Sequence, residues 1–388
     1  MLLDAPKIRL FHVLVATPAA ATGRGGIDRV MAGLRSQLGI AGVDDIAVEF
    51  RATRGRGHIA FAPLYLAAFL LRMLVLRALG RLDLVHINLS SMGSTLRKLQ
   101  VARLCRWLGV PYLIHLHGGA YPTYWKDDNS RLSRAILTMF NGAGLVIVLG
   151  EVWCRFVAER APDAVNRVVV LPNAAPRPSL PHIGGGDSVH ILFLGQLNAA
   201  KGVPQLGEAL GRIRGNPNWR ATLAGNGNLD EARAKAVELG IADRTDLPGW
   251  VDSPRVSELI ASADILVLPS FVENLPLSII EGMASGLAVV ATSVGAIEDV
   301  ITDGHTGLIV KAGDVDALTA ALARLVEDAQ LRARLGEAAM AVHAQRLELG
   351  VYARTVSSLW REVITAKRGR SGAPSTTAAV AARMANRR

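Results

Sequence analysis

Pro269–Gly286 reads PSFVENLPLSIIEGMASG, a segment in which two glutamates flank a proline. The apolar run at residues 265–269 leads into this segment and predicts a buried strand. Pro276 suits the first position of a helix, because its missing N–H would be unpaired there anyway. We therefore predict a strand, a loop that carries Glu273, and a helix that carries Glu281. The N-terminus of that helix, with its unpaired N–H groups and positive dipole, favours an anionic ligand beside the loop.

Spacing alone leaves two interpretations of Glu273 and Glu281 open. Leu277, Ile280 and Ala284 recur at helical spacing, so one side of the helix is expected to pack on a sheet and Glu281 becomes an inward-pointing acid. A solvated loop acid followed by a solvated helix acid would give the same pattern.

Patterns of strand, loop and helix repeat in both halves of the 388-residue chain. Half of the residues are apolar, which is enough for large cores. A segment rich in proline and glycine, residues 172–186, separates the halves and marks a domain boundary. These repeats predict a two-domain α/β protein.

The two glutamates also resemble a known motif. With seven residues between them and Gly-Met-Ala-Ser-Gly after them, they are similar to the donor site of retaining glycosyltransferases of family 4. The resemblance implies an α/β GT-B fold, in which two Rossmann-like domains with parallel sheets face an interdomain cleft. The expected parts are an acceptor-binding domain at residues 1–180, a nucleotide-sugar-binding domain at 181–350, a helix at 351–367 that crosses back onto the first domain, and a disordered basic tail at 368–388.

The resemblance also implies roles for the residues of this motif. Glu281 would bind the ribose hydroxyls of the nucleotide. Glu273, with Asn274 and Leu275 after it, would contact hydroxyls of the transferred sugar. Carboxylates suit both tasks because they accept paired hydrogen bonds from neighbouring hydroxyls.

Several positions elsewhere match the same family pattern. The resemblance implies that Gly25 and Gly26 contact the donor phosphates and the acceptor, and that His117 contacts the donor sugar. It implies that Gly195 and Gly225 contact the donor. It also implies that Lys201 contacts the diphosphate and Trp250 the base. Taken singly, the glycines are equally typical of ordinary turns, and a lone histidine after a strand is more often structural than catalytic.

Gln196 is the clearest departure from the family pattern, since an arginine is usual there. An amide cannot match a guanidinium in neutralising a diphosphate, so the identity of the donor and its affinity are put in question. Arg24 is a candidate for supplying the missing cation from the facing domain.

The net charge of +10 is concentrated in the first half of the chain and in the tail. A basic first half favours an anionic partner. Residues 61–80 are strongly apolar, but Arg72 and Arg77 interrupt them, and the longest run without charge is too short to span a bilayer. A helix lying along a membrane interface and a half-buried helix of an α/β domain both fit. Cys105 and Cys154 suggest neither a disulfide framework nor a metal site.

The expected reaction transfers a sugar from a nucleoside diphosphate, UDP or GDP, to an acceptor hydroxyl with the anomeric configuration kept. Negative charge growing on the leaving phosphate would be stabilised by Lys201, by the Gly25 and Gly26 amides and by the helix that starts near Pro276. We expect no cofactor and no metal. The expected acceptor is a growing or lipid-linked saccharide in envelope or exopolysaccharide assembly. The expected location is the cytoplasm, with peripheral contact on the inner face of an anionic membrane.

Two other classes of protein stay open. A GT-B-like nucleotide-sugar epimerase would use a similar cleft and could employ Glu273 with His117, but it would need no acceptor. A non-catalytic sugar-nucleotide-binding subunit would be compatible with Gln196. Nucleic-acid binding is disfavoured, because the basic residues come without a recognisable recognition module.

Overall fold

The computed structural model describes residues 10–19, 25–40, 43 and 45–369. This part of the chain divides into two compact units. The first contains residues up to Leu171 together with those from Gly350 onward, and the second is Pro172–Leu349. The expected disordered tail lies, except for its first two residues, outside the described residues, as does Arg24.

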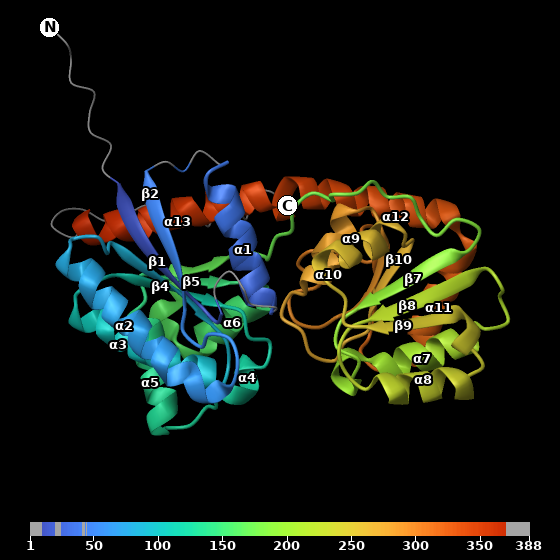
Figure 1. Ribbon diagram of the computed structural model, residues 1–388, viewed down its shortest axis with the longest axis horizontal. Coiled ribbons are helices and arrows are strands. Elements are labelled where there is room, and N and C mark those ends of the chain that lie inside the picture. Colours follow the sequence, from blue (N-terminus) through green and yellow to red (C-terminus); the bar gives the residue numbers. More distant parts are fainter. Residues whose placement is uncertain (1–9, 20–24, 41–42, 44, 370–388) are drawn as a thin grey trace, which may run out of the picture. The chain divides into compact units, whose positions relative to one another are not determined.

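The first unit is a six-stranded parallel sheet in the order β2-β1-β3-β4-β5-β6, with helices on both faces (Figure 1). Its inner strands are mostly apolar and buried, because both of their faces are covered. The strands are β1 Phe11–Thr17, β2 Ile46–Ala52, β3 Leu84–Leu89, β4 Tyr112–Leu116, β5 Leu145–Val148 and β6 Val168–Val170. The helices are α1 Gly26–Leu38, α2 Ala62–Ala78, α3 Gly93–Trp107, α4 Tyr121–Tyr124, α5 Arg131–Asn141, α6 Glu151–Arg160 and α13 Leu349–Gly369.

The second unit repeats this plan with the strand order β12-β11-β10-β7-β8-β9, again all parallel. In Figure 1, α9, α10 and α12 lie on one face of this sheet and α7, α8 and α11 on the other. The strands are β7 Val189–Leu194, β8 Trp219–Ala224, β9 Thr245–Gly249, β10 Ile265–Leu268, β11 Ala288–Thr292 and β12 Leu308–Val310. The helices are α7 Val203–Arg212, α8 Leu229–Glu238, α9 Ser253–Ala261, α10 Leu277–Ala284, α11 Val315–Glu327 and α12 Ala329–Val342.

Aspartates fix the starts of three helices in the second unit. The carboxylates of Asp252, Asp314 and Asp328 accept hydrogen bonds from backbone N–H groups in the first turns of α9, α11 and α12, at 3.1, 2.9 and 2.8 Å. Each cap satisfies an N–H group that has no partner within its helix. The sequence therefore sets these boundaries locally.

The prediction for Pro276 is wrong by one position. α10 begins at Leu277, and Pro276 is the residue before it, with an extended backbone at φ −72° and ψ 137°. Proline fixes φ near a value that helical and extended backbones share. A proline in the sequence therefore does not distinguish the first residue of a helix from the residue before it.

α2 is half-buried. Ala62, Phe69, Met73 and Leu76 are buried within the first unit, whereas much of the rest is exposed. By length and composition, Ile59–Ala78 is apolar enough to cross a membrane, and only 22% of its most apolar window is buried. The helix therefore combines both features that its sequence suggested, a core-facing side and an open apolar side.

α13 is fastened to the first unit by one aromatic and one ionic contact. The indole of Trp360, which is fully buried, donates to Nδ1 of His86 on β3 at 3.1 Å. Arg361 forms a bidentate pair with Asp45, at 2.8 and 2.5 Å. The guanidinium also lowers the pKa of the Asp45 carboxyl. These contacts join residues far apart in the sequence, so the first unit is complete only with the end of the chain.

Replacing Trp360 with alanine is expected to destabilise the first unit by about 3–5 kcal/mol, because it removes a buried aromatic side chain and leaves His86 without its donor. Urea unfolding followed by circular dichroism measures this change. Ser358→Ala, on the exposed side of α13, is the matched control. Equal midpoints for the two variants would contradict this account of α13.

Stability is expected to fall as the pH drops below about 6.5. His86 and His115 are fully buried, and burial lowers the pKa of His86 to about 3 and the pKa of His115 well below its usual value. The unfolded chain therefore binds more protons below pH 6.5, at a cost of about 1.4 kcal/mol per pH unit for each histidine. Above that pH the effect is absent.

His115→Leu isolates this effect. Within the described part of the chain, neither ring nitrogen of His115 has a hydrogen-bond partner, so an apolar replacement is expected to preserve stability near neutral pH and to flatten the pH dependence. Urea midpoints between about pH 7 and about pH 5 measure the slope. His305→Leu, at an exposed turn, should leave the slope unchanged. A slope in the His115 variant equal to that of the original chain would show that this imidazole does not carry the effect.

Candidate active site

The loop between β10 and α10 is held in place by its own backbone. Its carbonyl oxygens accept hydrogen bonds from the Thr292 hydroxyl, the Ala296 amide and the Asn173 side chain, at 2.6, 2.7 and 2.7 Å. The amide of Phe271 donates to the carbonyl of Ala200 at 2.9 Å. Loops without regular structure are usually mobile, but this one is tied to three other segments of the second unit. Glu273 therefore lies on a loop whose backbone is held in place by these hydrogen bonds.

Gly295 explains how closely the chain packs under this loop. It has a φ of 62°, and a Cβ there would lie 2.5 Å from the carbonyl oxygen of Glu273. Only glycine allows both the left-handed backbone and this approach. The contacts of Gly295, Asn173 and Thr292 could not be predicted from the sequence, because they connect segments far apart in the chain.

Lys201 and Glu273 form an ion pair. The Lys201 ammonium lies 2.5 Å from Oε1 of Glu273, and the Ser270 hydroxyl donates to the same oxygen at 2.9 Å. The Glu273 side chain is 9% exposed and the Lys201 side chain 25%, so the pair is largely shielded but the lysine can be reached from solvent. The structure thus brings together two predicted site residues that are 72 positions apart.

The loop after β7 positions Lys201. The side chain of Asn198 accepts a hydrogen bond from the Lys201 amide at 3.0 Å, which caps a short turn at Ala199–Lys201. Gly202 then adopts a φ of 71°, and a Cβ there would collide with the carbonyl of Pro269. The loops after β7 and β10 therefore meet backbone to backbone, and that contact sets the ion pair.

The ends of β7, β8 and β9 are equally close. The amide of Gly195 donates to Ala224 at 3.1 Å, and the amide of Gly225 donates to Gly249 at 2.8 Å. A Cβ on Gly225 would collide with the carbonyl of Gly195. Trp250 comes directly after β9 and is 48% exposed. Gly195, Gly225 and Trp250 thus lie at the carboxyl edge of neighbouring strands, where open α/β sheets bind ligands.

Gln196 and Glu281 are the two remaining predicted donor-site residues of the second unit that have a charged or amide side chain apart from Asn274. Gln196 is exposed, and its side-chain oxygen accepts a hydrogen bond from Asn198 at 3.3 Å. Glu281 is half-buried on α10, the helix that follows the fixed loop. Pro276, the residue before α10, provides no side-chain cap for that helix.

In the first unit, His117 directly follows β4, and its side chain contacts Asn88. Its Nε2 lies 2.8 Å from Oδ1 of Asn88, and the amide nitrogen of Asn88 donates to the carbonyl of Ala16 at 3.3 Å. The Asn88 oxygen must therefore face the histidine, so Nε2 carries the proton and Nδ1 carries the lone pair. Burial lowers the pKa of His117 to about 3. His117 is thus a neutral hydrogen-bond acceptor at physiological pH.

Gly25 and Gly26 stand at the start of α1. Neither has a positive φ, and a Cβ on either one would meet no heavy atom within 4 Å among the described residues. The local fold therefore does not require glycine at these positions. Among the described residues, nothing would contact a small side chain at either position.

No group of three or more His, Cys, Asp or Glu side chains that could hold a metal ion occurs within the described ranges.

Both halves of the chain match known family descriptions. Residues 9–174 match the "Glycosyl transferase 4-like domain", and residues 185–342 match "Glycosyl transferases group 1". The chain is 25% identical over 282 residues to an alpha-D-kanosaminyltransferase of Streptomyces kanamyceticus, covering 67% of this chain and 72% of that protein. It is 34% identical over 185 residues to a D-inositol 3-phosphate glycosyltransferase of Corynebacterium glutamicum, covering 45% of this chain and 43% of that protein.

Solved structures resemble the fold closely. A sucrose-phosphate synthase from Thermosynechococcus elongatus aligns with a TM-score of 0.74 at 19% identity, covering 92% of this chain and all of that one. HepE of Anabaena in complex with UDP aligns with a TM-score of 0.71 at 17% identity, covering 91% of this chain and all of that one. At this identity the likeness shows the fold alone. With both of its halves matched, the protein belongs to the glycosyltransferase group 1 family and has the GT-B fold.

Proposed function

We propose that the protein is a retaining hexosyltransferase that moves a sugar from a nucleoside diphosphate to an acceptor hydroxyl. The observation that carries the proposal is the Lys201–Glu273 pair, fixed at the carboxyl edge of the second sheet beside Gly195 and Gly225. A cation and a carboxylate side by side suit a ligand with a diphosphate at one end and hydroxyls at the other. HepE has been solved with UDP and with UDP-glucose, which favours UDP over GDP as the nucleotide here.

In this proposal Lys201 contributes its remaining N–H donors to the diphosphate while Glu273 holds it in place. Glu273 accepts hydrogen bonds from the sugar, and the backbone of Asn274 and Leu275 lies beside it. Glu281 binds the ribose. Trp250 offers an aromatic face to the base, and Gln196 supplies an amide where the family has a guanidinium, so Lys201 carries more of the charge neutralisation.

The chemistry breaks the bond between the anomeric carbon and the diphosphate oxygen and forms a bond to the acceptor oxygen on the same face. The acceptor proton passes to the departing phosphate. Lys201, the amides at Gly25–Gly26 and the start of α10 stabilise the charge that grows on the leaving group, and the reaction as proposed uses no metal. His117, neutral and with Nδ1 unprotonated, accepts a hydrogen bond from a sugar hydroxyl.

We further propose that the acceptor is a growing or lipid-linked saccharide, reached at the cytoplasmic face of an anionic membrane. The support is the open apolar side of α2 and the excess of basic residues in the first half of the chain. The transfer step separates this proposal from an epimerase, because an epimerase converts the donor without any acceptor.

Lys201→Met is expected to weaken UDP binding at least about tenfold and to lower kcat/KM for UDP-sugar turnover about 10²–10³-fold, because one preorganised cation is lost. Calorimetry with UDP and the release of UDP from UDP-glucose measure the two effects. Lys235→Met is the matched control, since Lys235 is also in an ion pair of the second unit, with Glu238 on the surface of α8. Unchanged affinity in the Lys201 variant would refute its assigned role.

A panel of nucleotide sugars tests the proposal as a whole by thermal shift, since a ligand that binds only the folded state raises the melting temperature. UDP-sugars are expected to raise Tm, and Glu281→Ala is expected to abolish the rise because it removes the ribose contact. Glu298→Ala, an exposed acid of the same unit, should behave like the original chain. A panel in which no nucleotide sugar shifts Tm would overturn the proposed function.

A further inference from the structure

Ser270 lies two residues after β10, at the start of the loop that carries Glu273. Its side chain is fully buried, with an exposed fraction of 0%. Its hydroxyl donates to Oε1 of Glu273 at 2.9 Å. The hydroxyl of Thr292, at the end of β11, donates to the carbonyl of Ser270 at 2.6 Å. Because the backbone of Ser270 is held in this way, its hydroxyl approaches Glu273 from a fixed position.

Both donors that bond to Glu273 use the same carboxylate oxygen. The Lys201 ammonium lies 2.5 Å from Oε1, and the Ser270 hydroxyl donates to Oε1 as well. Among the described residues, no donor bonds to Oε2. A carboxylate has about four acceptor sites on its two oxygens, so Oε1 is fully used and Oε2 keeps its whole capacity for a ligand. The Glu273 side chain is only 9% exposed, so little water competes for that oxygen.

The two donors would respond differently to a nucleotide sugar. The Lys201 side chain is 25% exposed, and its ammonium has three N–H donors that a diphosphate would share with Glu273. The Ser270 hydroxyl has a single hydrogen atom, which already bonds to Glu273. When the attraction of Lys201 is divided between the carboxylate and the phosphates, Ser270 is the partner that keeps the carboxylate in its orientation.

We infer that Ser270 is a positioning residue that directs Oε2 of Glu273 at one hydroxyl of the donor sugar. The sugar hydroxyl donates to Oε2, because an ionised carboxylate can only accept. A sugar that lacks this hydroxyl leaves a shielded acceptor unpaired and is rejected. Ser270 thus contributes to the choice of the sugar without touching it. This role deepens the proposed function and rests on it.

Ser270→Ala separates the sugar from the nucleotide. The probes are UDP and the UDP-sugar of the panel that gives the largest rise in Tm. The affinity for UDP is expected to change less than about twofold, because UDP carries no sugar and Lys201 is retained. For the UDP-sugar, kcat/KM of UDP release is expected to fall about tenfold to a hundredfold, as is typical of a lost hydrogen bond to a charged group. Ser270→Cys, which keeps a weaker donor, should give an intermediate loss.

Monodeoxy versions of the same UDP-sugar identify the hydroxyl. For one of them, Ser270→Ala is expected to cause no further loss of kcat/KM, because the hydroxyl that Oε2 would receive is already absent. For the others, the loss caused by Ser270→Ala should add to the loss caused by the missing hydroxyl. If Ser270 only supported the fold, the two losses would add for every deoxy donor.

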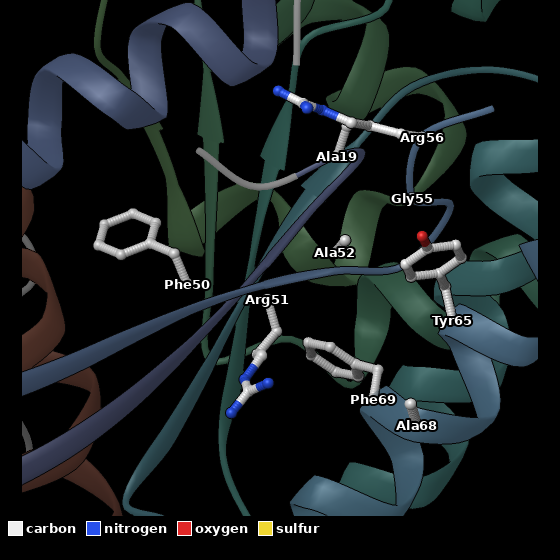
Figure 2. A pocket seen from close by; sticks show the side chains of 9 residues that line it. All are labelled: Ala19, Phe50, Arg51, Ala52, Gly55, Arg56, Tyr65, Ala68 and Phe69. Atoms are coloured by element: carbon white, nitrogen blue, oxygen red, sulfur yellow. The ribbon is translucent and has the colours of Figure 1, made fainter. Parts of the chain in front are cut away.

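Two control variants lose a hydroxyl outside the site. Ser357 on α13 is also fully buried, and its hydroxyl donates to the carbonyl of Ala353 at 2.7 Å. Figure 2 shows the hydroxyl of Tyr65 in a pocket of about 460 Å³ that Phe69 and the end of β2 also line, in the first unit. Ser357→Ala and Tyr65→Phe are expected to keep the kcat/KM of the original chain, since neither side chain contacts Glu273.

An unchanged kcat/KM in Ser270→Ala, or losses that add for every deoxy donor, would overturn the inference and leave the proposed function standing. A loss of UDP affinity as large as the loss of kcat/KM would also overturn it, since the hydroxyl would then serve the nucleotide or the fold. An original chain that neither binds nor turns over any UDP-sugar would overturn the proposed function, and this inference with it.

Discussion

The contact between Lys201 and Glu273 depends on backbone packing that only glycine permits. Gly202 lets the loop after β7 touch Pro269, and Gly295 lets a third segment press against the carbonyl of Glu273. A largely shielded ion pair contributes little net stability, because desolvation offsets most of the attraction. The ion pair therefore matters because it fixes the positions of the Lys201 ammonium and the Glu273 carboxylate. The two charges are held at the edge of the sheet, where a ligand can use both.

The first unit follows a different principle, since its polar groups are buried among aromatic rings. His86, His115 and His117 stand close together, with ring centroids 5.4 and 4.0 Å apart, and Trp360 closes one end of the row. Burial keeps these imidazoles neutral, so they pack in the core as uncharged polar side chains. Only His117, which Asn88 orients and which is partly exposed, has an atom suited to a ligand. The end of the chain thus supports the part of the first unit that we assign to the sugar.

The sequence predicted the strand at residues 265–269 and the repeated α/β pattern of both halves, because strands that are covered on both faces are mostly apolar. It also predicted that Glu273 and Lys201 share a site, through resemblance to a family. It could not predict that they bond to each other, since that contact joins segments 72 residues apart through glycine-dependent loop packing. The start of α10 was misplaced at Pro276, because proline fits the residue before a helix as well as the first residue within it. Of the two interpretations of residues 61–80, the half-buried helix is confirmed, and the helix lying along a membrane interface stays a prediction.

The central claim is that the fixed pair at the carboxyl edge of the second sheet binds the reacting end of an activated sugar. A crystal structure of the chain with UDP-glucose tests it most directly. The account predicts a diphosphate oxygen within about 2.7–3.2 Å of the Lys201 ammonium and a glucose hydroxyl at similar distance from Glu273. A nucleotide bound away from the loops after β7 and β10, with the ion pair untouched, would contradict it.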